Sequence, residues 1–289
     1  MNRYFVPKRA EEAVSLLVSY APRARLLAGG TDLVCDSGHM LRDDLVLIDV
    51  TSIEGLSDIQ PLDNGGLRVG AGVTHAQVCG SEVIRHDYPC LWEASSAVGS
   101  VQVRNLGTVA GNLCNGSPAA DTAPPLMALG ATLELLGPEG KRAVPLVSFF
   151  AGPKETHLRP AEMLTAILLS PPRLAGGSAY VKLGRRKAMD LALASAAVTM
   201  TGQFPLIHCA IALGSVAPTP VRAFRAEGLF ERTAPSAEFF KEVAGRVAEE
   251  CYPIADVRAT ARYRSLMIPV VTELALGRAW ERLRRLSWD

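Results

Sequence analysis

Two short glycine turns constrain this chain more than any other feature of its sequence. AGGTD, at residues 28–32, follows the compact apolar segment RLLA, and TVAGN, at residues 108–112, lies between apolar segments. Glycine lets backbone N–H groups approach a phosphate closely, and consecutive amides of this kind form an anion-binding nest. Two such turns could hold the two phosphates of one dinucleotide, although either turn alone is also ordinary loop sequence. Neither matches GxGxxG, and a Walker A sequence is absent, so the pattern does not favour a Rossmann or P-loop site.

Hydrophobic periodicity predicts short helices and strands up to residue 172. Apolar residues at helical spacing indicate a helix over residues 11–20. Residues 64–66, Asn-Gly-Gly, are a hairpin signal, and Thr74 is typical of a helix N-cap. Pro124 and Pro125 fit the first turn of a helix that opens near residue 121, where a missing amide costs little. The other expected elements are a helix from residue 89 to about residue 98 and strands over residues 25–28, 45–50, 67–71, 131–136 and 163–169.

A glycine-rich segment divides the expected elements into two groups. LAGGS, at residues 174–178, is the best candidate linker and follows two prolines. Beyond it we expect two apolar strands and then two amphipathic helices, over residues 192–201, 206–214, 236–251 and 265–286. A length of 289 residues suits one or two domains. We therefore predict a first domain at residues 1–175, with lobes at about 1–55 and 56–175, and a second domain at residues 176–289.

Charge and hydropathy exclude several classes of partner. Thirty Lys and Arg residues against 29 Asp and Glu leave a formal charge of +1, so the chain carries no broad electrostatic footprint for nucleic acid or an anionic membrane. No apolar run approaches the roughly 18 residues that span a bilayer, and the N-terminus has no secretory signal. We expect a cytoplasmic protein without an integral membrane segment. The six cysteines are scattered without a CxxC pair, which predicts isolated buried thiols and no metal site.

Three stretches of the sequence resemble the FAD-binding subunits of molybdenum hydroxylases, such as the medium subunit of aerobic carbon monoxide dehydrogenase and the corresponding domain of xanthine dehydrogenase. They are LLAGGTDLV at residues 26–34, GTVAGNLCNGSPAADTAPPLMALGATLEL at 107–135 and SAYVKLGRRKAMDLALASAAV at 178–198. Their order and spacing extend the resemblance over nearly the whole chain. It implies an α+β fold, with a two-lobed FAD-binding domain of the vanillyl-alcohol-oxidase-like type. A smaller α+β domain resembling the carbon monoxide dehydrogenase flavoprotein C-terminal domain would follow.

The resemblance also implies which residues bind FAD. The first turn would wrap the pyrophosphate, residues of the second turn would do so from the opposite side, and Asn115 and Ser117 would line the same cleft. The full expected set is Leu27, Ala28, Gly29, Gly30, Thr31, Asp32, Leu33, Val98, Thr108, Ala110, Gly111, Asn112, Asn115, Ser117, Asp121, Leu164, Lys182 and Leu191.

Three of these residues have individual roles in the family pattern. Asp121 would accept a hydrogen bond from a sugar or ribityl hydroxyl, although it could equally be the N-cap of the next helix. Leu164 would contact the cofactor, although core packing alone also explains a leucine there. Lys182 would lie beside the flavin N1/C2=O edge and stabilise negative charge there. Apart from the resemblance, Lys182 would be interpreted as a solvated strand residue.

Two further features stay open at this point. The loop at residues 184–190, with Arg185, Arg186 and Lys187, resembles the mobile segment that covers the flavin in xanthine dehydrogenase, but adjacent cations also form solvated turns. His75 follows a glycine-rich stretch, and we interpret it as a surface residue at a helix start rather than a covalent flavin attachment point. None of the five histidines has metal-ligand spacing.

The resemblance implies partners as well. The chain has no iron–sulfur or molybdopterin motif, so FAD would be its only redox centre, and we assign no catalytic residue. We expect an iron–sulfur subunit, a molybdopterin-binding large subunit that oxidises the substrate, assembly as a dimer of heterotrimers, and a small-molecule acceptor such as NAD, a quinone or oxygen. Two rival hypotheses are a stand-alone flavin-dependent oxidase or dehydrogenase, which needs its own base beside the ring, and a structural subunit with a vestigial flavin site.

Overall fold

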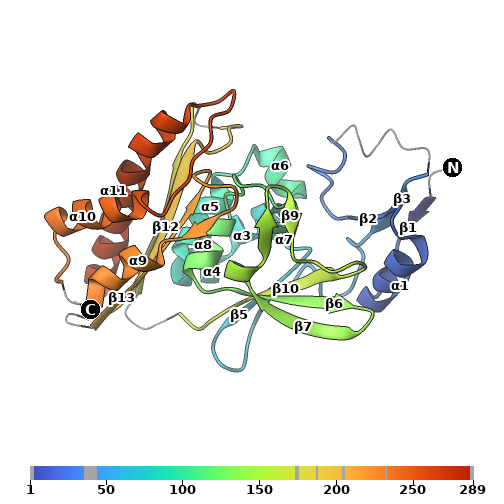
Figure 1. Ribbon diagram of the computed structural model, residues 1–289. Helices are drawn as coiled ribbons and strands as arrows, with labels where there is room; N and C mark the ends of the chain where they lie inside the picture. Colours follow the sequence, from blue (N-terminus) through green and yellow to red (C-terminus); the bar gives the residue numbers. More distant parts are fainter. Residues whose placement is uncertain are drawn as a thin grey trace.

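The first lobe is a small parallel sheet that ends at the AGGTD turn. The computed structural model describes residues 3–35, 44–172, 176–186, 188–203, 206–231 and 233–286 (Figure 1). Strands β1 (Arg3–Phe5), β3 (Val46–Asp49) and β2 (Ala24–Leu27) pair in that order and all run parallel, with α1 (Ala10–Tyr20) joining β1 to β2. The buried side chains of Ala13 and Ile48 connect helix and sheet in one core. The predicted helix and both strands are confirmed, whereas β1 is a short exposed edge strand without the alternation that signals a strand.

The second lobe is built on an antiparallel sheet of five strands. Their order is β4 (Ile59–Pro61), β5 (Leu67–Gly70), β10 (Met163–Leu169), β6 (Thr132–Gly137) and β7 (Gly140–Pro145). The predicted hairpin is present, since Gly65 takes a φ of 81° and its N–H donates to the Leu62 carbonyl. A smaller hairpin of β8 (Phe150–Gly152) and β9 (Glu155–Thr156) lies beside this sheet. These strands agree with the predicted ones to within a few residues.

Six short helices lie between this sheet and the C-terminal part of the chain (Figure 1). They are α3 (His75–Gly80), α4 (Glu82–Asp87), α5 (Pro89–Ser96), α6 (Val101–Leu106), α7 (Val109–Cys114) and α8 (Ala123–Ala128). Thr74 caps α3 reciprocally with Gln77, which confirms the predicted N-cap. Pro124 and Pro125 lie in the first turn of α8 as expected. Helices α6 and α7 are too short to show a clear periodicity in the sequence.

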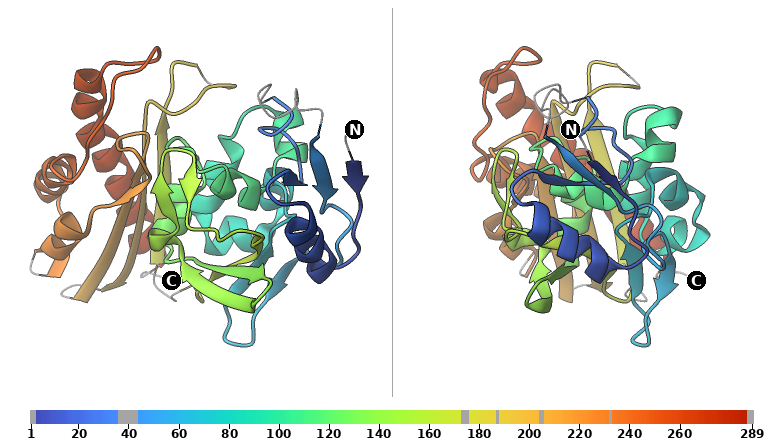
Figure 2. Two further views of the ribbon diagram at one scale, coloured as in Figure 1. Left: turned by 45° about the vertical axis from the view of Figure 1, so that its right-hand side comes forward. Right: turned by 90° about the vertical axis from the view of Figure 1, so that its right-hand side faces the viewer.

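The C-terminal part combines an antiparallel sheet with a helical layer (Figure 2). Its strands are β11 (Gly176–Leu183), β12 (Ala194–Gln203), β13 (Leu206–Gly214) and β14 (Val221–Arg222), and its helices are α9 (Phe224–Glu227), α10 (Ala237–Ala248) and α11 (Ala261–Leu286). One face of the sheet packs on α11, through residues such as Ala179 and Val181. The other face packs on α5 and α8, through residues such as Tyr180 and Ala197. The N-terminal part therefore covers the face of the sheet that α11 leaves open.

The predicted linker is partly wrong. Gly176, Gly177 and Ser178 belong to β11, while residues 174 and 175 lie outside the described part of the chain. A Cβ on Gly177 would lie 2.0 Å from the Ala279 carbonyl oxygen, so this glycine lets α11 approach the strand closely. Glycine here serves packing and not flexibility. The division into domains at residue 175 stays a prediction, because the sheet is buried from both sides.

Two expectations from composition can be compared with the structure. All six cysteines are free thiols, as predicted, but only Cys90 and Cys251 are buried, and Cys35 is exposed. Among the described residues, no helix is both long and apolar enough to span a membrane.

Candidate functional site

The structure brings the first glycine turn into direct contact with the residues immediately before the second, Leu106 and Gly107. A Cβ on Gly29 would lie 1.8 Å from the Leu106 carbonyl oxygen and 2.9 Å from the Gly107 nitrogen. A Cβ on Gly107 would lie 3.4 Å from Thr31 Oγ1. Only a residue without a side chain fits at position 29, because its neighbours are main-chain atoms that cannot rotate away. The turn after β2 and the connection from α6 to α7 therefore form one main-chain surface.

The AGGTD turn exposes its main chain beside this contact. Gly30 has a φ of 68°, which favours glycine, and its carbonyl accepts from the Val34 N–H at 2.9 Å. Most predicted residues of this segment are half-buried, and Asp32 is exposed; the half-buried set is Leu27, Ala28, Gly29, Gly30, Thr31 and Leu33. A tight, half-buried turn at the end of a strand is a geometry that suits an oxyanion.

The second turn differs from the prediction. TVAGN is the start of α7, in which Thr108 is the N-cap and its Oγ1 accepts from the Gly111 N–H at 2.9 Å. The Gly111 amide is therefore satisfied within the chain, although Gly111 itself is exposed, while Thr108 and Ala110 are buried. An isolated bridge between Thr74 and Thr108 fixes this start against the residues before α3. The sequence pattern did not distinguish an open turn from a capped helix end, because both use Thr and Gly.

The loop after α7 is held by the chain itself. Asn112 Oδ1 accepts from Thr122 Oγ1 at 2.7 Å, and Asn115 Oδ1 accepts from Lys154 Nζ at 2.8 Å. Ser117 Oγ accepts from the Ala119 N–H at 3.2 Å. These three predicted residues shape the loop between α7 and α8. Only the polar atoms that these hydrogen bonds leave unpaired are free to bind a ligand.

Asp121 and Lys182 form a buried ion pair at the junction of the two parts of the chain. Lys182 Nζ lies 2.7 Å from Asp121 Oδ2 and 3.0 Å from the Ala97 carbonyl oxygen. Tyr180 Oη donates to Asp121 Oδ1 at 2.7 Å. The exposed fractions are only 12% for the Lys182 side chain and 7% for the Asp121 side chain. Both the N-cap interpretation of Asp121 and the solvated interpretation of Lys182 are therefore wrong.

Burial and charge act on this cluster in opposite directions. Burial raises the pKa of the Asp121 carboxyl, while the Lys182 charge and the hydrogen bonds from Lys182 and Tyr180 act to lower it. Burial, and next the Asp121 charge, raises the pKa of Tyr180 well above its ordinary value. Tyr180 thus remains a protonated donor. A carboxylate can accept about four hydrogen bonds, so Asp121 keeps acceptor capacity beyond these two partners.

The remaining predicted residues differ in how far they are exposed. Val98 and Leu164 are buried, and Leu164 adjoins an irregularity in the pairing of β10 with β6. Leu191 is exposed and follows the cationic loop. Asp190 anchors that loop by accepting from the N–H groups of Arg185 and Arg186, at 2.5 and 3.0 Å. The loop also meets the residues before α6, where the Met189 N–H donates to the Gly99 carbonyl, while Lys187 lies outside the described residues.

His75 is not the surface residue that we predicted. Only 2% of it is exposed, and its Nδ1 has no hydrogen-bond partner among the residues that the structure describes. The main-chain N–H of His75 donates to the Gly107 carbonyl at 3.0 Å, and the imidazole ring packs near Gly107. Burial, followed by the charge of Arg104, lowers the pKa of His75 to about 4, so it is neutral at physiological pH. His75 therefore packs against Gly107, which contacts the first glycine turn.

Tyr180 and the Glu93–Arg282 pair are functional candidates that the sequence analysis missed. Tyr180 lies two residues before Lys182, and alternation along a strand places both on one face. That spacing was the available signal, but it required knowing that residues 176–183 form a strand. Glu93 and Arg282 come from distant helices and carry no local signal.

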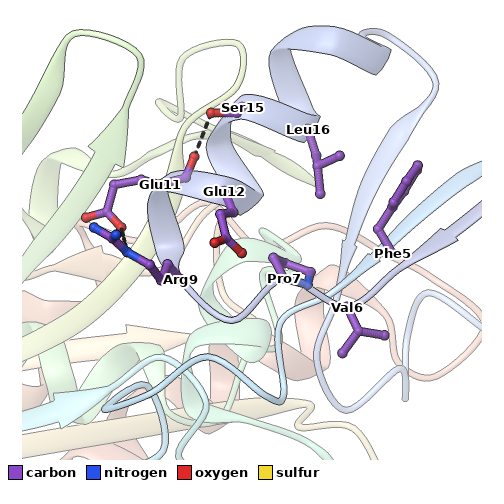
Figure 3. Close-up of a pocket in the computed structure, with 8 residues that line it drawn as sticks. All are labelled: Phe5, Val6, Pro7, Arg9, Glu11, Glu12, Ser15 and Leu16. Atoms are coloured by element: carbon purple, nitrogen blue, oxygen red, sulfur yellow. Dashed lines mark hydrogen bonds and ion pairs between the residues drawn. The ribbon is translucent and has the colours of Figure 1, made fainter.

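A separate surface pocket contains none of the predicted residues (Figure 3). It has a volume of about 530 Å³ and lies between β1 and α1, where Phe5, Pro7, Glu12 and Leu16 line it. Within the described ranges, no three His, Cys, Asp or Glu side chains gather as a metal site requires.

The residues present fit an FAD molecule. Gly29 puts no side chain over the main chain of the AGGTD turn, because a Cβ there would meet the Leu106 carbonyl oxygen. Exposed apolar side chains are Val101 and Leu106 of α6, Met189 of the cationic loop and Leu191 just after it. Large exposed apolar groups beside a polar main-chain surface suit a ligand with a flat ring and a charged diphosphate. Fold and site together define a two-domain flavoprotein of the FAD-binding α+β class.

Comparison with known proteins gives the family. Residues 1–172 match the FAD binding domain in molybdopterin dehydrogenase, and residues 179–279 match the CO dehydrogenase flavoprotein C-terminal domain. The chain therefore belongs to the FAD-binding subunits of the molybdenum hydroxylase family, and its cofactor is FAD. The matches confirm the predicted family, the two-domain α+β fold and the cofactor.

Individual relatives are similar over almost their whole length. The xanthine dehydrogenase FAD-binding subunit of Escherichia coli O157:H7 is 31% identical over 272 residues, which cover 93% of this chain and 92% of the relative. The carbon monoxide dehydrogenase medium chain of Afipia carboxidovorans is 34% identical over 283 residues, 97% of each chain. Among solved structures, carbon monoxide dehydrogenase from Hydrogenophaga pseudoflava has a chain with a TM-score of 0.92, 33% identity and 97% coverage of both chains. These relatives are subunits of oxidoreductases, and this chain is likewise an oxidoreductase subunit.

Proposed function

We propose that this chain passes electrons from the iron–sulfur clusters of a partner subunit, through FAD, to a small-molecule acceptor such as NAD, a quinone or oxygen. The observation that carries the proposal is the joined main-chain surface of the two glycine segments, beside a buried ion pair and exposed apolar groups. Similarity to dehydrogenase subunits over more than nine-tenths of their length supports the same role. When bound, FAD supplies transfer of electrons singly or in pairs.

The main chain would hold the diphosphate. The main chains of Gly29 and Leu106 are in contact. The diphosphate would lie next to this contact, near the amides of residues 29–32 and the start of α7. Amides of residues 29–32, fixed at the end of strand β2, need no rearrangement to donate to an anion, whereas the Gly111 amide at the start of α7 already donates to Thr108 Oγ1. Asn112, Asn115 and Ser117 would line the cleft through the side-chain atoms that the loop leaves unpaired.

Asp121 and Lys182 would set the position of the flavin end. Asp121 would accept from a ribityl or sugar hydroxyl with its remaining lone pairs. Lys182 donates twice within the chain, which leaves one of its three N–H groups without a partner among the described residues. That N–H would point to the ring edge, where positive charge stabilises the reduced form. Val98, Leu164 and Leu191 would contact the ring from buried and exposed sides.

The architecture of the complex follows from the same proposal. An iron–sulfur subunit and a molybdopterin-binding large subunit would complete the electron path, in a dimer of heterotrimers, with the substrate oxidised on the large subunit. The first 175 residues would form the FAD-binding domain, and the rest, from residue 176, would form a second domain that contributes Lys182 to a shared site.

Flavin content and reduction test the proposal together. The full chain should be purified with FAD, and its visible absorption should bleach when a reduced iron–sulfur partner is added. Lys182→Met should weaken FAD binding, whereas Lys141→Met, at an exposed position on β7, should not. A chain that never binds FAD would support the vestigial hypothesis. Bleaching by a small organic substrate without partners would support the stand-alone oxidase or dehydrogenase.

A further inference from the structure

Strand β11 lies at the edge of its sheet, and its free edge is occupied by an ion pair from two other elements. Glu93, on α5, accepts from the Tyr180 N–H through Oε2 at 2.7 Å. Arg282, on α11, donates to the Ser178 carbonyl and to Glu93 Oε1. The carboxylate and the guanidinium thus bind the N–H and C=O groups that a neighbouring strand would otherwise pair.

A second contact fixes the same end of the strand. Ser178 Oγ accepts from the Cys90 N–H, also on α5, at 3.2 Å. Helix α5 therefore holds β11 at two alternate residues, Ser178 and Tyr180. These contacts join the part of the chain before residue 172 to the part after residue 176.

The next alternate residue of the strand is Lys182. Residues 178, 180 and 182 point to one face, and a step of two residues advances roughly 7 Å along a strand. Tyr180 is the link, because its N–H binds Glu93 while its hydroxyl binds Asp121 at 2.7 Å. A shift of the β11 edge would move the Tyr180 hydroxyl and the Lys182 ammonium together, relative to Asp121.

We propose that Glu93, held by Arg282, is a positioning residue for the FAD site that acts through β11 on the Tyr180–Asp121–Lys182 cluster. The inference rests on the proposed function, which places Asp121 and Lys182 against FAD. Glu93 itself need not touch the cofactor. Its carboxylate fixes where Lys182 lies, and so sets how strongly FAD is held and how easily it is reduced.

A merely structural ion pair would behave differently. Partly exposed ion pairs contribute little to stability, and the Glu93 and Arg282 side chains are 20% and 35% exposed. The chain offers a matched control in Glu162, just before β10, whose carboxylate accepts two hydrogen bonds at 2.6 Å from Arg142 on β7 of the second-lobe sheet. Glu162→Gln should lower the stability of the chain without changing FAD binding.

The experiment measures the FAD dissociation constant and the midpoint potential of bound FAD in the full chain. Glu93→Gln keeps the size of the side chain but cannot serve a backbone N–H and a guanidinium as two charge-assisted acceptors. We expect FAD to bind about tenfold more weakly, in line with the loss of one hydrogen bond from the displaced Lys182 to FAD. The midpoint potential should become more negative, because Lys182 moves from the ring edge. Arg282→Lys, which keeps the charge but loses the forked donor, should shift both quantities in the same direction by less.

A double-variant cycle with Lys182→Met separates positioning from general destabilisation. If Glu93 acts through Lys182, the change in midpoint potential that Glu93→Gln causes should vanish in the Lys182→Met chain. A change that persists there would overturn the inference, as would unchanged affinity and potential in Glu93→Gln while Lys182→Met alters both. If Lys182→Met and Asp121→Asn leave both quantities unchanged, the proposed FAD site itself fails.

Discussion

Gly29→Ala is the smallest change that should separate the two glycine segments. The added Cβ would meet the Leu106 carbonyl oxygen at 1.8 Å, its carbon at 2.4 Å and the Gly107 nitrogen at 2.9 Å. All three are main-chain atoms, so no side-chain rotation relieves the clash. Either the AGGTD turn or the α6–α7 connection must move by more than an ångström, since carbon and oxygen pack at about 3.5 Å.

The cost follows from what each response would break. Overpacking a fitted interior costs about 1–3 kcal/mol, and the rigid neighbours place Gly29→Ala at the upper end. Movement of Gly107 would also strain the hydrogen bond from the His75 main-chain N–H to the Gly107 carbonyl, at 3.0 Å, and the bridge between Thr74 and Thr108. We therefore expect a loss of about 3 kcal/mol in the free energy of unfolding, and FAD binding weakened by a factor of about 100 or more.

Urea unfolding of the cofactor-free chain and FAD titration measure the two effects. Gly245→Ala is the matched control. Gly245 is an exposed residue within helix α10, and a Cβ there would meet nothing within 4 Å. That variant should gain about 0.5–1 kcal/mol, since alanine favours a helix, and bind FAD normally. If Gly29→Ala binds FAD as tightly as the parent chain, the joined glycine segments do not form the diphosphate site.

Three further predictions follow from buried groups. Because the pKa of His75 is lowered to about 4 in the folded chain, protonation favours the unfolded state, and the free energy of unfolding should fall by about 3 kcal/mol as pH drops from 6.5 to about 4. His75→Gln should flatten that pH profile in urea titrations, and an identical slope in both chains would refute the assignment. Asp121→Asn should cost about 3 kcal/mol by leaving the Lys182 ammonium buried without its partner. The double variant Asp121→Asn with Lys182→Met should recover part of this loss, and strictly additive losses would contradict the pairing. Gly177→Ala should lower the melting temperature by pushing α11 from β11, because its Cβ would lie 2.0 Å from the Ala279 oxygen; an unchanged melting temperature would show that the two elements separate without cost.

Sequence patterns predicted the local elements well because their signals are local. The Thr74 cap, the hairpin at residues 64–66 and the prolines of α8 each depend on a few adjacent residues, and all are present in the structure. The glycines at 176 and 177 were interpreted as a linker, because the sequence alone cannot show that a distant helix packs against them.

The sequence predicted which residues belong to the candidate site better than it predicted how they contact one another. The resemblance to a known family pointed to Asp121 and Lys182, but no local pattern indicated that they pair with each other or with Tyr180. Burial of His75 was missed for the same reason, since its cover comes from residues near 107. Such contacts depend on tertiary packing, which local propensity does not encode.

The central claim is that the main-chain surface formed by residues 29–32 and the start of α7 holds the diphosphate of FAD. An experimental structure of the full chain with FAD bound tests it most directly. We predict phosphate oxygens within about 3 Å of backbone nitrogens of residues 29–32, beside the start of α7, with the flavin ring toward Lys182. A diphosphate seated away from the contact between Gly29 and Leu106, for instance in the pocket between β1 and α1, would contradict the account.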